Sequence, residues 1–482
     1  MVIKFFNTFG RKIEVFEPRN PPLVHLYTCG PTVYSTAHLG NLRTYLFTDI
    51  LCRVLTWANF QVKQVMNLTD VGHLTDDASD GEDKIERAAS AQKKSVWEIS
   101  QRFMDIFKQH LCELNIREPQ QWMRATDSIT DQITLIQTLE TKGFTYATKD
   151  GIYFDTSKFP RYSSFAKLDI NKLKEGARVA ENPERRNPSD FALWKFSPVD
   201  QKRQMEWDAP WGKGFPGWHI ECSAMAMKAF GQSLDIHTGG TDHIPVHHTN
   251  EIAQSEAATG QPLARYWLHG AFLVVNDGRM GKSEGNALTL DTVKEHGFSP
   301  LVFRYYILQT HYRKILQFSW EAMSAAQEGL ARLQGFADRV QYLHQNVPKN
   351  GRINPPLQAL LHDLRRAFED AASDDLNMPE ALAAIHTFIT DCYKLLEKSP
   401  WAQSDTQAII EQFRELDRVV GLNLLEGKTI ENIPDDIQAL VLAREEARRD
   451  RDFQRADLLR AQIEQQGFLL EDQPHGSRLK KV

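Results

Sequence analysis

Apolar positions in the first quarter of the chain alternate between short continuous runs and longer stretches at helical spacing. The run Leu23–Tyr27 predicts a buried strand, and Gly30 and Pro31 end it. Apolar residues then recur every three or four positions, which predicts a helix over 38–58. The same pattern predicts a strand over Val62–Leu68 and helices near 82–92 and 95–113. Because strands that alternate with helices usually pair in parallel, we expect an α/β fold with a Rossmann-like, doubly wound sheet.

The alternation stops between residues 116 and 205. This stretch predicts a helix around 126–142, a strand over Gly151–Asp155 and a polar linker over 182–188. We interpret it as an insertion between two halves of the sheet. The sheet is expected to resume with strands over Leu234–His237 and Ala271–Val275, separated by a helix over 246–258.

After Trp320 the pattern changes to long amphipathic helices, which predict an α-helical bundle. These helices are expected at about 320–345, 355–372, 379–398 and 404–420. A linker near 426–436 and two helices within 437–466 indicate a small C-terminal domain. The predicted segments are therefore 1–115 and 206–319 for the two halves of the α/β domain, 116–205 for the insertion, 320–425 for the bundle and 426–482 for the C-terminal domain.

Composition excludes several classes of protein. With 482 residues, of which 41% are hydrophobic and 25% charged, the chain fits a globular protein with more than one core. No apolar run approaches the ~20 residues that span a bilayer, so we expect no membrane association. Five scattered cysteines without a C-x-x-C pair favour a reducing, cytoplasmic location. Because the net charge is −6, any RNA contact must come from local basic surfaces.

Two stretches could bind phosphate groups. His38 and Gly40 stand at the start of a predicted helix, after a strand and a turn, where backbone N–H groups and the helix dipole attract anions. Residues 278–286 form a glycine-punctuated loop with the cations Arg279 and Lys282, which can fold over a triphosphate. The residues alone leave an ordinary alternative for each stretch, a common strand–turn–helix unit for the first and a surface turn for the second.

Four residues could bind a metal ion. His247 and Glu251 are four positions apart on a predicted helix, so their side chains share one face, whereas His248 points about 100° away and is excluded from it. Cys29 ends the first strand and Cys222 begins a helix, and both are expected at the carboxyl edge of the sheet. The alternatives are a surface His–Glu pair and cysteines that serve as small buried hydrophobes.

Taken together, the two phosphate-binding stretches resemble the signatures of class I aminoacyl-tRNA synthetases. His38-Leu39-Gly40-Asn41 is similar to the HIGH motif, and Arg279-Met280-Gly281-Lys282-Ser283 is similar to KMSKS. The run Thr28–Tyr34 resembles the cysteinyl-tRNA synthetases, and the resemblance continues through Asp374–Leu382 almost to the C-terminus. The chain departs from the motifs at Asn41, where HIGH ends in His, and at Arg279 and Gly281, where KMSKS has Lys and Ser.

The resemblance implies an enzyme that activates L-cysteine with ATP and transfers it to the 3′ end of tRNA(Cys). We expect a monomer, although the sequence does not determine the oligomeric state. The resemblance implies an active-site Zn²⁺, selecting the substrate thiolate, with the ligands Cys29, Cys222, His247 and Glu251. It implies catalytic roles for His38, Asn41 and Lys282, and cysteine contacts from Gly30, Thr69 and Trp218. ATP, accompanied by Mg²⁺, is expected to bind His38, Gly40, Asn41, Asp242, Arg279, Met280, Lys282 and Ser283. The insertion would lie over the acceptor end of the tRNA, and 426–482 would bind the anticodon.

Three other functions compete with this interpretation. A ligase of the same fold that joins cysteine to an amino-sugar would lack a C-terminal module such as 437–478. A non-catalytic RNA-binding paralogue would be expected to lose His38, Lys282 or a metal ligand, and all of these are present. A protein that uses zinc only to shape an interaction surface would not explain the two phosphate-binding stretches. The synthetase interpretation accounts for more of the chain than any of the three.

Overall fold

The computed structural model describes residues 1–71, 84–167, 183–198, 203–231, 233–275, 278–279, 287–349, 351–426, 434–473 and 476–481. The chain forms two compact units. The first comprises Met1–Ala331, Arg365–Ile385 and Glu415–Leu422, and the second comprises Arg332–Leu364, His386–Arg414 and Asn423–Val482. Among the described helices, none combines the length and the apolar character needed to cross a membrane.

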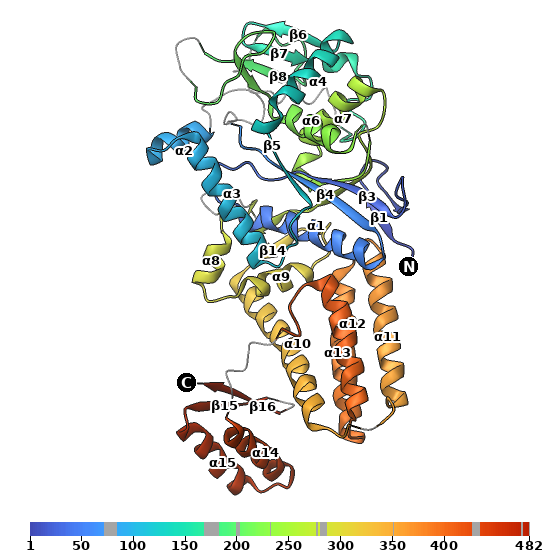
Figure 1. Cartoon of the computed structure of the whole chain (residues 1–482), viewed down its shortest axis with the longest axis vertical. Coiled ribbons are helices and arrows are strands. Elements are labelled where there is room, and N and C mark those ends of the chain that lie inside the picture. Colours follow the sequence, from blue (N-terminus) through green and yellow to red (C-terminus); the bar gives the residue numbers. More distant parts are fainter. Residues whose placement is uncertain are drawn as a thin grey trace. The chain divides into compact units, whose positions relative to one another are not determined.

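A parallel sheet forms the centre of the first unit (Figure 1). Its strand order is β11 (Ala264–Gly270), β10 (Leu234–Gly240), β3 (Leu23–Thr28), β4 (Gln61–Leu68) and β5 (Gln121–Arg124). The chain builds outwards from β3 to β5 and then crosses to β10 on the other side, so the order reverses between β3 and β10. Sheets of this kind bind ligands at the carboxyl ends of the strands beside such a reversal. The predicted doubly wound α/β fold is confirmed.

The helices of this unit follow the predicted spacing closely. The helix predicted over 38–58 is α1 (Leu39–Trp57), and the helix predicted over 95–113 is α3 (Val96–Glu113), which Ser95 and Glu98 start with a capping box. Further helices of the unit are α2 (Lys84–Gln92), α4 (Ile129–Thr141), α6 (Trp218–Phe230), α7 (His247–Thr259), α8 (Leu290–Glu295) and α9 (Pro300–Leu308).

One strand prediction is wrong about the sheet to which the strand belongs. Within the predicted run Ala271–Val275, β12 (Leu273–Val275) pairs with β13 (Gly278–Arg279) and β14 (Leu316–Phe318) in a separate small sheet. The central sheet ends instead at β11, which the apolar pattern did not predict because polar residues such as Arg265 and His269 interrupt it.

The insertion forms an antiparallel sheet in the order β6 (Thr145–Thr148), β7 (Gly151–Phe154), β8 (Phe191–Phe196) and β9 (Gly214–Pro216). The predicted strand over Gly151–Asp155 is therefore β7, whereas β6, β8 and β9 were not predicted. The Tyr162 hydroxyl donates to Asn250 Oδ1 at 2.5 Å, and Arg161 pairs with Glu256 at 2.7 Å. Both partners lie on α7, so the insertion is held against the helix that carries two candidate metal ligands.

An N-terminal hairpin, β1 (Lys4–Asn7) and β2 (Lys12–Val15), reaches the β11 edge of the central sheet. The Trp267 N–H donates to Asn7 Oδ1 at 3.0 Å, and the Thr8 N–H donates to the Trp267 carbonyl at 2.9 Å. The sequence did not predict this hairpin because each strand has only four residues, too few for a clear alternation.

The far end of α1 carries a buried ionic group. The Asp49 carboxylate lies 2.8 Å from Arg53 Nε and 2.7 Å from Arg304 Nη2, and none of these side chains is more than 5% exposed. Arg53 also donates to the Arg418 carbonyl at 3.1 Å, and Arg304 donates to the Val420 carbonyl at 2.7 Å. Burial acts to raise the pKa of Asp49, but Arg304 and Arg53 outweigh it and hold that pKa below its ordinary value.

The long C-terminal helices match their predicted bounds to within one residue. They are α10 (Trp320–Asn346), α11 (Pro355–Ser373), α12 (Met378–Lys398) and α13 (Gln403–Val420). In the second unit the rings of Phe336, Phe388 and Phe413 pack together, with centroids 5.4–6.2 Å apart. Beyond them follow α14 (Asp435–Arg449), α15 (Phe453–Gln465) and an unpredicted hairpin, β15 (Phe468–Gln473) and β16 (Gly476–Lys481).

Candidate metal centre and active site

The four predicted metal ligands come together in the structure. Cys29 follows β3 directly, Cys222 lies in the second turn of α6, and His247 and Glu251 lie in the first two turns of α7. One ligand atom from each residue lies within 4.8 Å of the other three, and all four residues are buried. Two sulfurs, an imidazole nitrogen and a carboxylate oxygen suit Zn²⁺ in a tetrahedral site.

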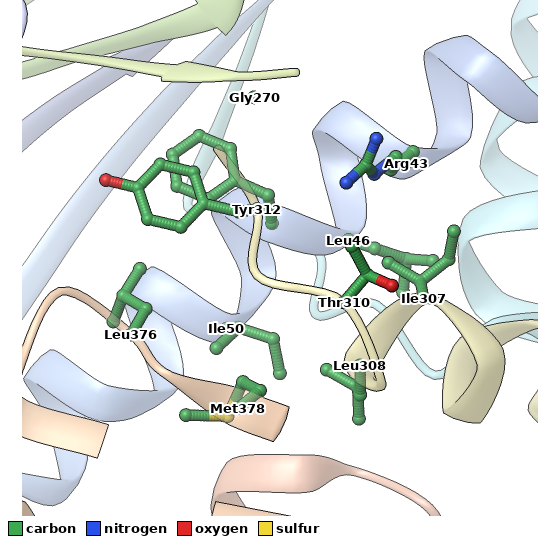
Figure 2. Close-up of a pocket in the computed structure, with 11 residues that line it drawn as sticks. Arg43, Leu46, Ile50, Gly270, Ile307, Leu308, Thr310, Tyr312, Leu376 and Met378 are labelled. Carbon is green, nitrogen blue, oxygen red and sulfur yellow. The ribbon is translucent and has the colours of Figure 1, made fainter. Parts of the chain in front are cut away.

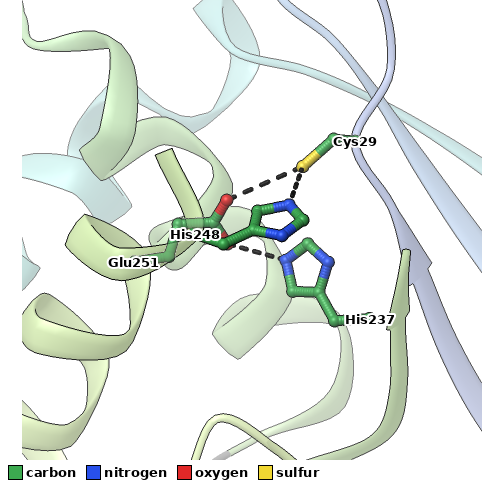
Figure 3. Close-up of side chains that lie close together, drawn as sticks. All are labelled: Cys29, His237, His248 and Glu251. Atoms are coloured by element: carbon green, nitrogen blue, oxygen red, sulfur yellow. Dashed lines mark hydrogen bonds and ion pairs between the residues drawn. The ribbon is translucent and has the colours of Figure 1, made fainter. Parts of the chain in front are cut away.

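The helical spacing of His247 and Glu251 is confirmed, but the exclusion of His248 is wrong. His247 Nε2 lies 2.9 Å from Glu251 Oε1. His248 Nε2, however, lies 3.4 Å from Cys29 Sγ, as Figure 3 shows. The physical reason is that Cys29 approaches α7 from the end of β3 and can meet both histidines, although their side chains leave the helix in different directions. Cys29, His237, His248 and Glu251 therefore form a second, overlapping group of close ligand atoms.

Neighbouring histidines hold the proposed ligands in place. His237 Nε2 lies 2.7 Å from Glu251 Oε2, and His219 Nδ1 lies 2.9 Å from His247 Nδ1. The His219 contact occupies the nitrogen of His247 that does not face Glu251, so it fixes which ring atom turns toward the cluster. Sequence reasoning missed these supports. A signal existed, because six of the 16 histidines fall within 219–269.

Burial and neighbouring charges shift the pKa values of the cluster in different directions. Burial raises the pKa of Cys29 well above its ordinary value. A hydrogen bond from Cys29 outweighs burial at Cys222 and, with His247, lowers the Cys222 pKa to about 7. Burial acts to lower the pKa of His247, but Glu251 and Cys222 raise it to about 10. Without a metal ion, the proton on His247 thus balances Cys222 and Glu251, and a bound cation would take the place of that proton.

A chain of hydrogen bonds links the neighbours of the two candidate cysteine ligands. The Gly30 N–H donates to Asn67 Oδ1 at 2.7 Å, Asn67 Nδ2 donates to Thr69 Oγ1 at 3.0 Å, and the Thr69 hydroxyl donates to Glu221 Oε2 at 3.1 Å. Gly30 is required here because a Cβ atom would lie 1.7 Å from the Asn67 carbonyl oxygen. Gly30 and Thr69 were predicted as substrate contacts, whereas Asn67 and Glu221 gave no signal in the sequence.

Trp218 packs against the cluster. Its ring centroid is 4.5 Å from that of His247, and the side chain is only partly buried. An aromatic ring that is packed on a candidate ligand and still partly exposed can form the wall of a small-molecule pocket. The substrate contact proposed for Trp218 stays a prediction.

The first turn of α1 fixes the orientation of His38. The Asn41 N–H donates to His38 Nδ1 at 3.2 Å, and the His38 N–H donates to Asn41 Oδ1 at 3.2 Å, which together make a capping box. Because Nδ1 accepts this bond, the neutral ring carries its proton on Nε2. Gly40 leaves room for the ring, since a Cβ atom there would lie 3.0 Å from two of its atoms.

The remaining predicted ATP contacts are only partly visible. Asp242 lies exposed in a short 3₁₀ helix, Thr241–His243, at the carboxyl end of β10. The Arg279 backbone pairs with Val274, but nothing is described of its side chain. Met280, Lys282 and Ser283 lie outside the described residues.

A pocket beside α1 has a different character from the metal cluster (Figure 2). Its lining is apolar or glycine apart from Arg43, Thr310 and Tyr312. The Arg43 guanidinium is already bonded to backbone carbonyls, including that of Ala271 at 3.0 Å, and the Tyr312 hydroxyl donates to Asp375 at 2.7 Å. Its polar groups thus serve the fold, and we assign the chemistry to the metal cluster and the start of α1.

Comparisons with known proteins identify the family to which the chain is similar. The family model of the tRNA synthetases class I (C) catalytic domain matches residues 15–328. The Burkholderia lata protein "Cysteine--tRNA ligase 1" is 43% identical over 481 residues, covering 99% of this chain and 97% of that protein. The "Cysteine--tRNA ligase" of Treponema denticola is 39% identical over 502 residues and covers 100% of both. Among solved structures, Mycobacterium tuberculosis methionyl-tRNA synthetase in complex with methionyl-adenylate has a TM-score of 0.59 at 17% identity, covering 83% of this chain and 90% of that chain, which supports the fold.

Proposed function

The chain belongs to the cysteine–tRNA ligases, a family of class I tRNA synthetases, and from this we propose that it activates L-cysteine with ATP and transfers it to the 3′ end of tRNA(Cys). The observation that carries the proposal is the buried cluster of Cys29, Cys222, His247 and Glu251. A cysteine–amino-sugar ligase would share the sheet and the cluster, but the cysteine–tRNA ligases of Burkholderia lata and Treponema denticola match the whole chain, including the C-terminal module.

We propose that these four residues bind Zn²⁺, because their donor atoms fit its preferred ligands and His219 and His237 support two of them. When bound, the ion supplies a Lewis-acid centre that takes the sulfur of cysteine as a thiolate. Serine offers a neutral hydroxyl instead. A pocket that discriminated by size alone would favour cysteine over serine by only ~1–3 kcal/mol of binding free energy. A centre that binds sulfur selectively could discriminate more strongly, so no editing domain would be needed.

The residues beside the cluster are proposed to hold the rest of the amino acid. Gly30 and Thr69 end adjacent strands and are connected through Asn67, which keeps their spacing constant. Trp218 forms a wall above His247. Together they would orient the cysteine carboxylate toward the start of α1, which is the positioning that an in-line attack on ATP requires.

We propose that α1 and the basic loop neutralise the phosphates of ATP. A cysteine carboxylate oxygen forms a bond to the α-phosphorus while the bond to pyrophosphate breaks, and no general base is needed because the carboxylate is already ionised. His38 is proposed to donate from Nε2, supported by the Asn41 cap. Lys282 is proposed to neutralise the leaving group, with Mg²⁺ accompanying ATP. Gly40, Asp242, Arg279, Met280 and Ser283 remain proposed ATP contacts.

The proposed tRNA contacts follow the predicted division of the chain. The insertion over 116–205 is proposed to lie at the acceptor end, and 426–482 is proposed to bind the anticodon. In α14 and α15 the basic residues Arg448, Arg455 and Arg460 could supply the local positive charge that the overall net charge of −6 does not. We propose a monomer in the reducing cytoplasm, where the scattered thiols would stay reduced.

The test is ATP–pyrophosphate exchange by purified full-length protein, with cysteine and serine in parallel and zinc quantified on the same sample. We expect exchange with cysteine, near silence with serine and about one zinc per chain. No exchange from folded, zinc-loaded protein would overturn the enzymatic proposal and favour an RNA-binding paralogue. Equal exchange with serine would keep the enzyme and overturn the zinc-based selection. Charging of a tRNA(Cys) transcript, with an amino-sugar acceptor as the competitor, then identifies the acceptor.

A further inference from the structure

A row of hydrogen bonds connects the N-terminal hairpin to Cys29. Thr8 Oγ1 lies 2.8 Å from His269 Nδ1, His269 Nε2 lies 2.7 Å from His248 Nδ1, and His248 Nε2 lies 3.4 Å from Cys29 Sγ. All four side chains are buried. The row therefore begins 21 residues before Cys29 in sequence and reaches it through two other parts of the chain.

The fold brings Thr8 to this position through backbone contacts. After β1 the chain follows β11, because the Thr8 N–H bonds to the Trp267 carbonyl, and this places the hydroxyl beside His269 two residues further along β11. In β10, Gly239 lies opposite His269, and a Cβ atom there would lie 2.7 Å from the His248 ring. Because glycine has no side chain, the His248 ring fits between this strand and Cys29 without a steric clash.

The Cys29 end of the row determines which nitrogen of each histidine carries the proton. A neutral imidazole donates from one nitrogen and accepts at the other. His269 Nε2 and His248 Nδ1 face each other at 2.7 Å, and one of the two must accept, so these buried rings cannot both be protonated. For two neutral rings, the direction of the row follows from its ends. A metal-bound Cys29 sulfur can only accept, so His248 must donate from Nε2 and accept at Nδ1. His269 must then donate from Nε2 and accept at Nδ1, where the Thr8 hydroxyl donates.

We infer that Thr8 and His269 are positioning residues, which keep His248 in the tautomer whose Nε2–H points at the Cys29 sulfur. This inference rests on the proposed zinc site. A hydrogen bond to the sulfur withdraws electron density that it would otherwise give to the metal, and the metal then binds the substrate thiolate more strongly. Without the Thr8 hydroxyl, the hydrogen bond that favours the Nε2 tautomer of His269 is lost, and the Cys29 sulfur alone has to hold His248 in the donating tautomer.

The experiment compares Thr8→Val with Thr8→Ser in the full-length protein loaded with Co²⁺ in place of Zn²⁺. Valine removes the hydroxyl at nearly constant volume, whereas serine retains it. We expect Thr8→Val to move the thiolate-to-cobalt charge-transfer band to longer wavelength. We expect it to raise the KM for cysteine about 10-fold, at the lower end of the effects seen for groups behind a metal ligand, with kcat little changed. Thr8→Ser is expected to restore both values.

Thr48→Val is the matched control. Thr48 is buried, and its hydroxyl bonds to the Thr44 carbonyl at 3.1 Å and to Thr238 at 3.3 Å rather than to the histidine row. It should leave the band unchanged. If Thr8→Val does not fold, Thr8→Ala provides the same loss of the hydroxyl.

The possible outcomes separate the two proposals. A wild-type spectrum and KM for Thr8→Val would overturn the positioning role, and so would a failure of Thr8→Ser to restore them, because packing rather than the hydroxyl would then be responsible. An identical band shift in Thr48→Val would also overturn it. If the wild-type protein itself shows no thiolate–cobalt band, the proposed zinc site fails and the inference fails with it.

Discussion

Two places in the first unit bury charged groups, and they balance that charge in opposite ways. At Asp49 the chain supplies the cations itself, since Arg53 and Arg304 both contact the carboxylate. At Glu251 the carboxylate is equally buried, but its partners are the histidines His237 and His247, and two cysteines adjoin it. The first group is complete as a protein structure. The second collects electron-pair donors around one point and carries its positive charge as a proton on His247, so a metal ion could bind there by displacing that proton.

The largest expected effect removes one of these donors. Cys222→Ser replaces a soft sulfur by a neutral hydroxyl, so we expect loss of bound zinc and a fall in cysteine-dependent pyrophosphate exchange on the order of 1,000-fold, about 4 kcal/mol. Metal analysis and the exchange assay measure both effects. Cys392→Ser is the control, because Cys392 is also fully buried but lies outside the cluster. Retention of one zinc by Cys222→Ser would contradict its role as a ligand.

The complementary change breaks the self-contained group. Asp49→Asn leaves two buried guanidinium groups without their carboxylate, and we expect the free energy of unfolding to fall by about 3–5 kcal/mol while zinc content stays the same. Urea-induced unfolding measures the change. Glu415→Gln removes the exposed pair with Arg418 at 3.0 Å and should cost less than about 1 kcal/mol. If zinc were lost from folded Asp49→Asn, the two groups would not be independent.

The pH dependence of the Asp49 contribution has a definite sign. Because the folded pKa of Asp49 lies below the ordinary value of 3.8, its stabilising effect is complete above that value and is lost as the pH falls through the folded pKa. We therefore expect the stability difference between wild type and Asp49→Asn to be constant from pH 8 to pH 5. It should shrink only below about pH 4. If the stability difference already changed between pH 8 and pH 6, a titrating group other than Asp49 would be responsible for the change.

A smaller effect is expected at the start of α1. Gly40→Ala places a Cβ atom 3.0 Å from the His38 ring, which must turn away from its cap. We expect pyrophosphate exchange to fall about 10-fold, which corresponds to the loss of one hydrogen bond of about 1.4 kcal/mol, with zinc content unchanged. Gly335→Ala, in α10, has open space around the new methyl group and should keep full exchange. Normal exchange by Gly40→Ala would show that the His38 orientation is not critical.

The sequence predicted what depends on local spacing. The bounds of α1 and of the long C-terminal helices follow from apolar periodicity, and the His247–Glu251 contact follows from helical geometry. The resemblance then identified the two cysteines that join this pair. The ligand atoms of all four residues lie within 4.8 Å of one another only because of the tertiary fold, which no local sequence pattern predicts.

The failures have the same origin. His248 was excluded because its direction was judged from its own helix, whereas the position of Cys29 on the neighbouring strand decides what it contacts. The edge strand β11 was missed because Arg265 and His269 interrupt its apolar run, although both have partners elsewhere in the fold. Asn67 and Glu221 could not be predicted, because their importance depends on which residues the folded chain places beside them.

The two buried groups also differ in when they can form during synthesis. The four metal ligands have all been translated once Glu251 is incorporated, but the carbonyls that complete the Asp49 group include those of Arg418 and Val420. The intervening stretch of about 170 residues takes on the order of 10–30 s to translate at 5–20 residues per second. During that interval the proposed metal ligands are all present, while Arg53 and Arg304 still lack the two carbonyls that the last bundle helix supplies. The proposed metal site could therefore stabilise the sheet early in synthesis, whereas the contacts from the last bundle helix can stabilise it only late.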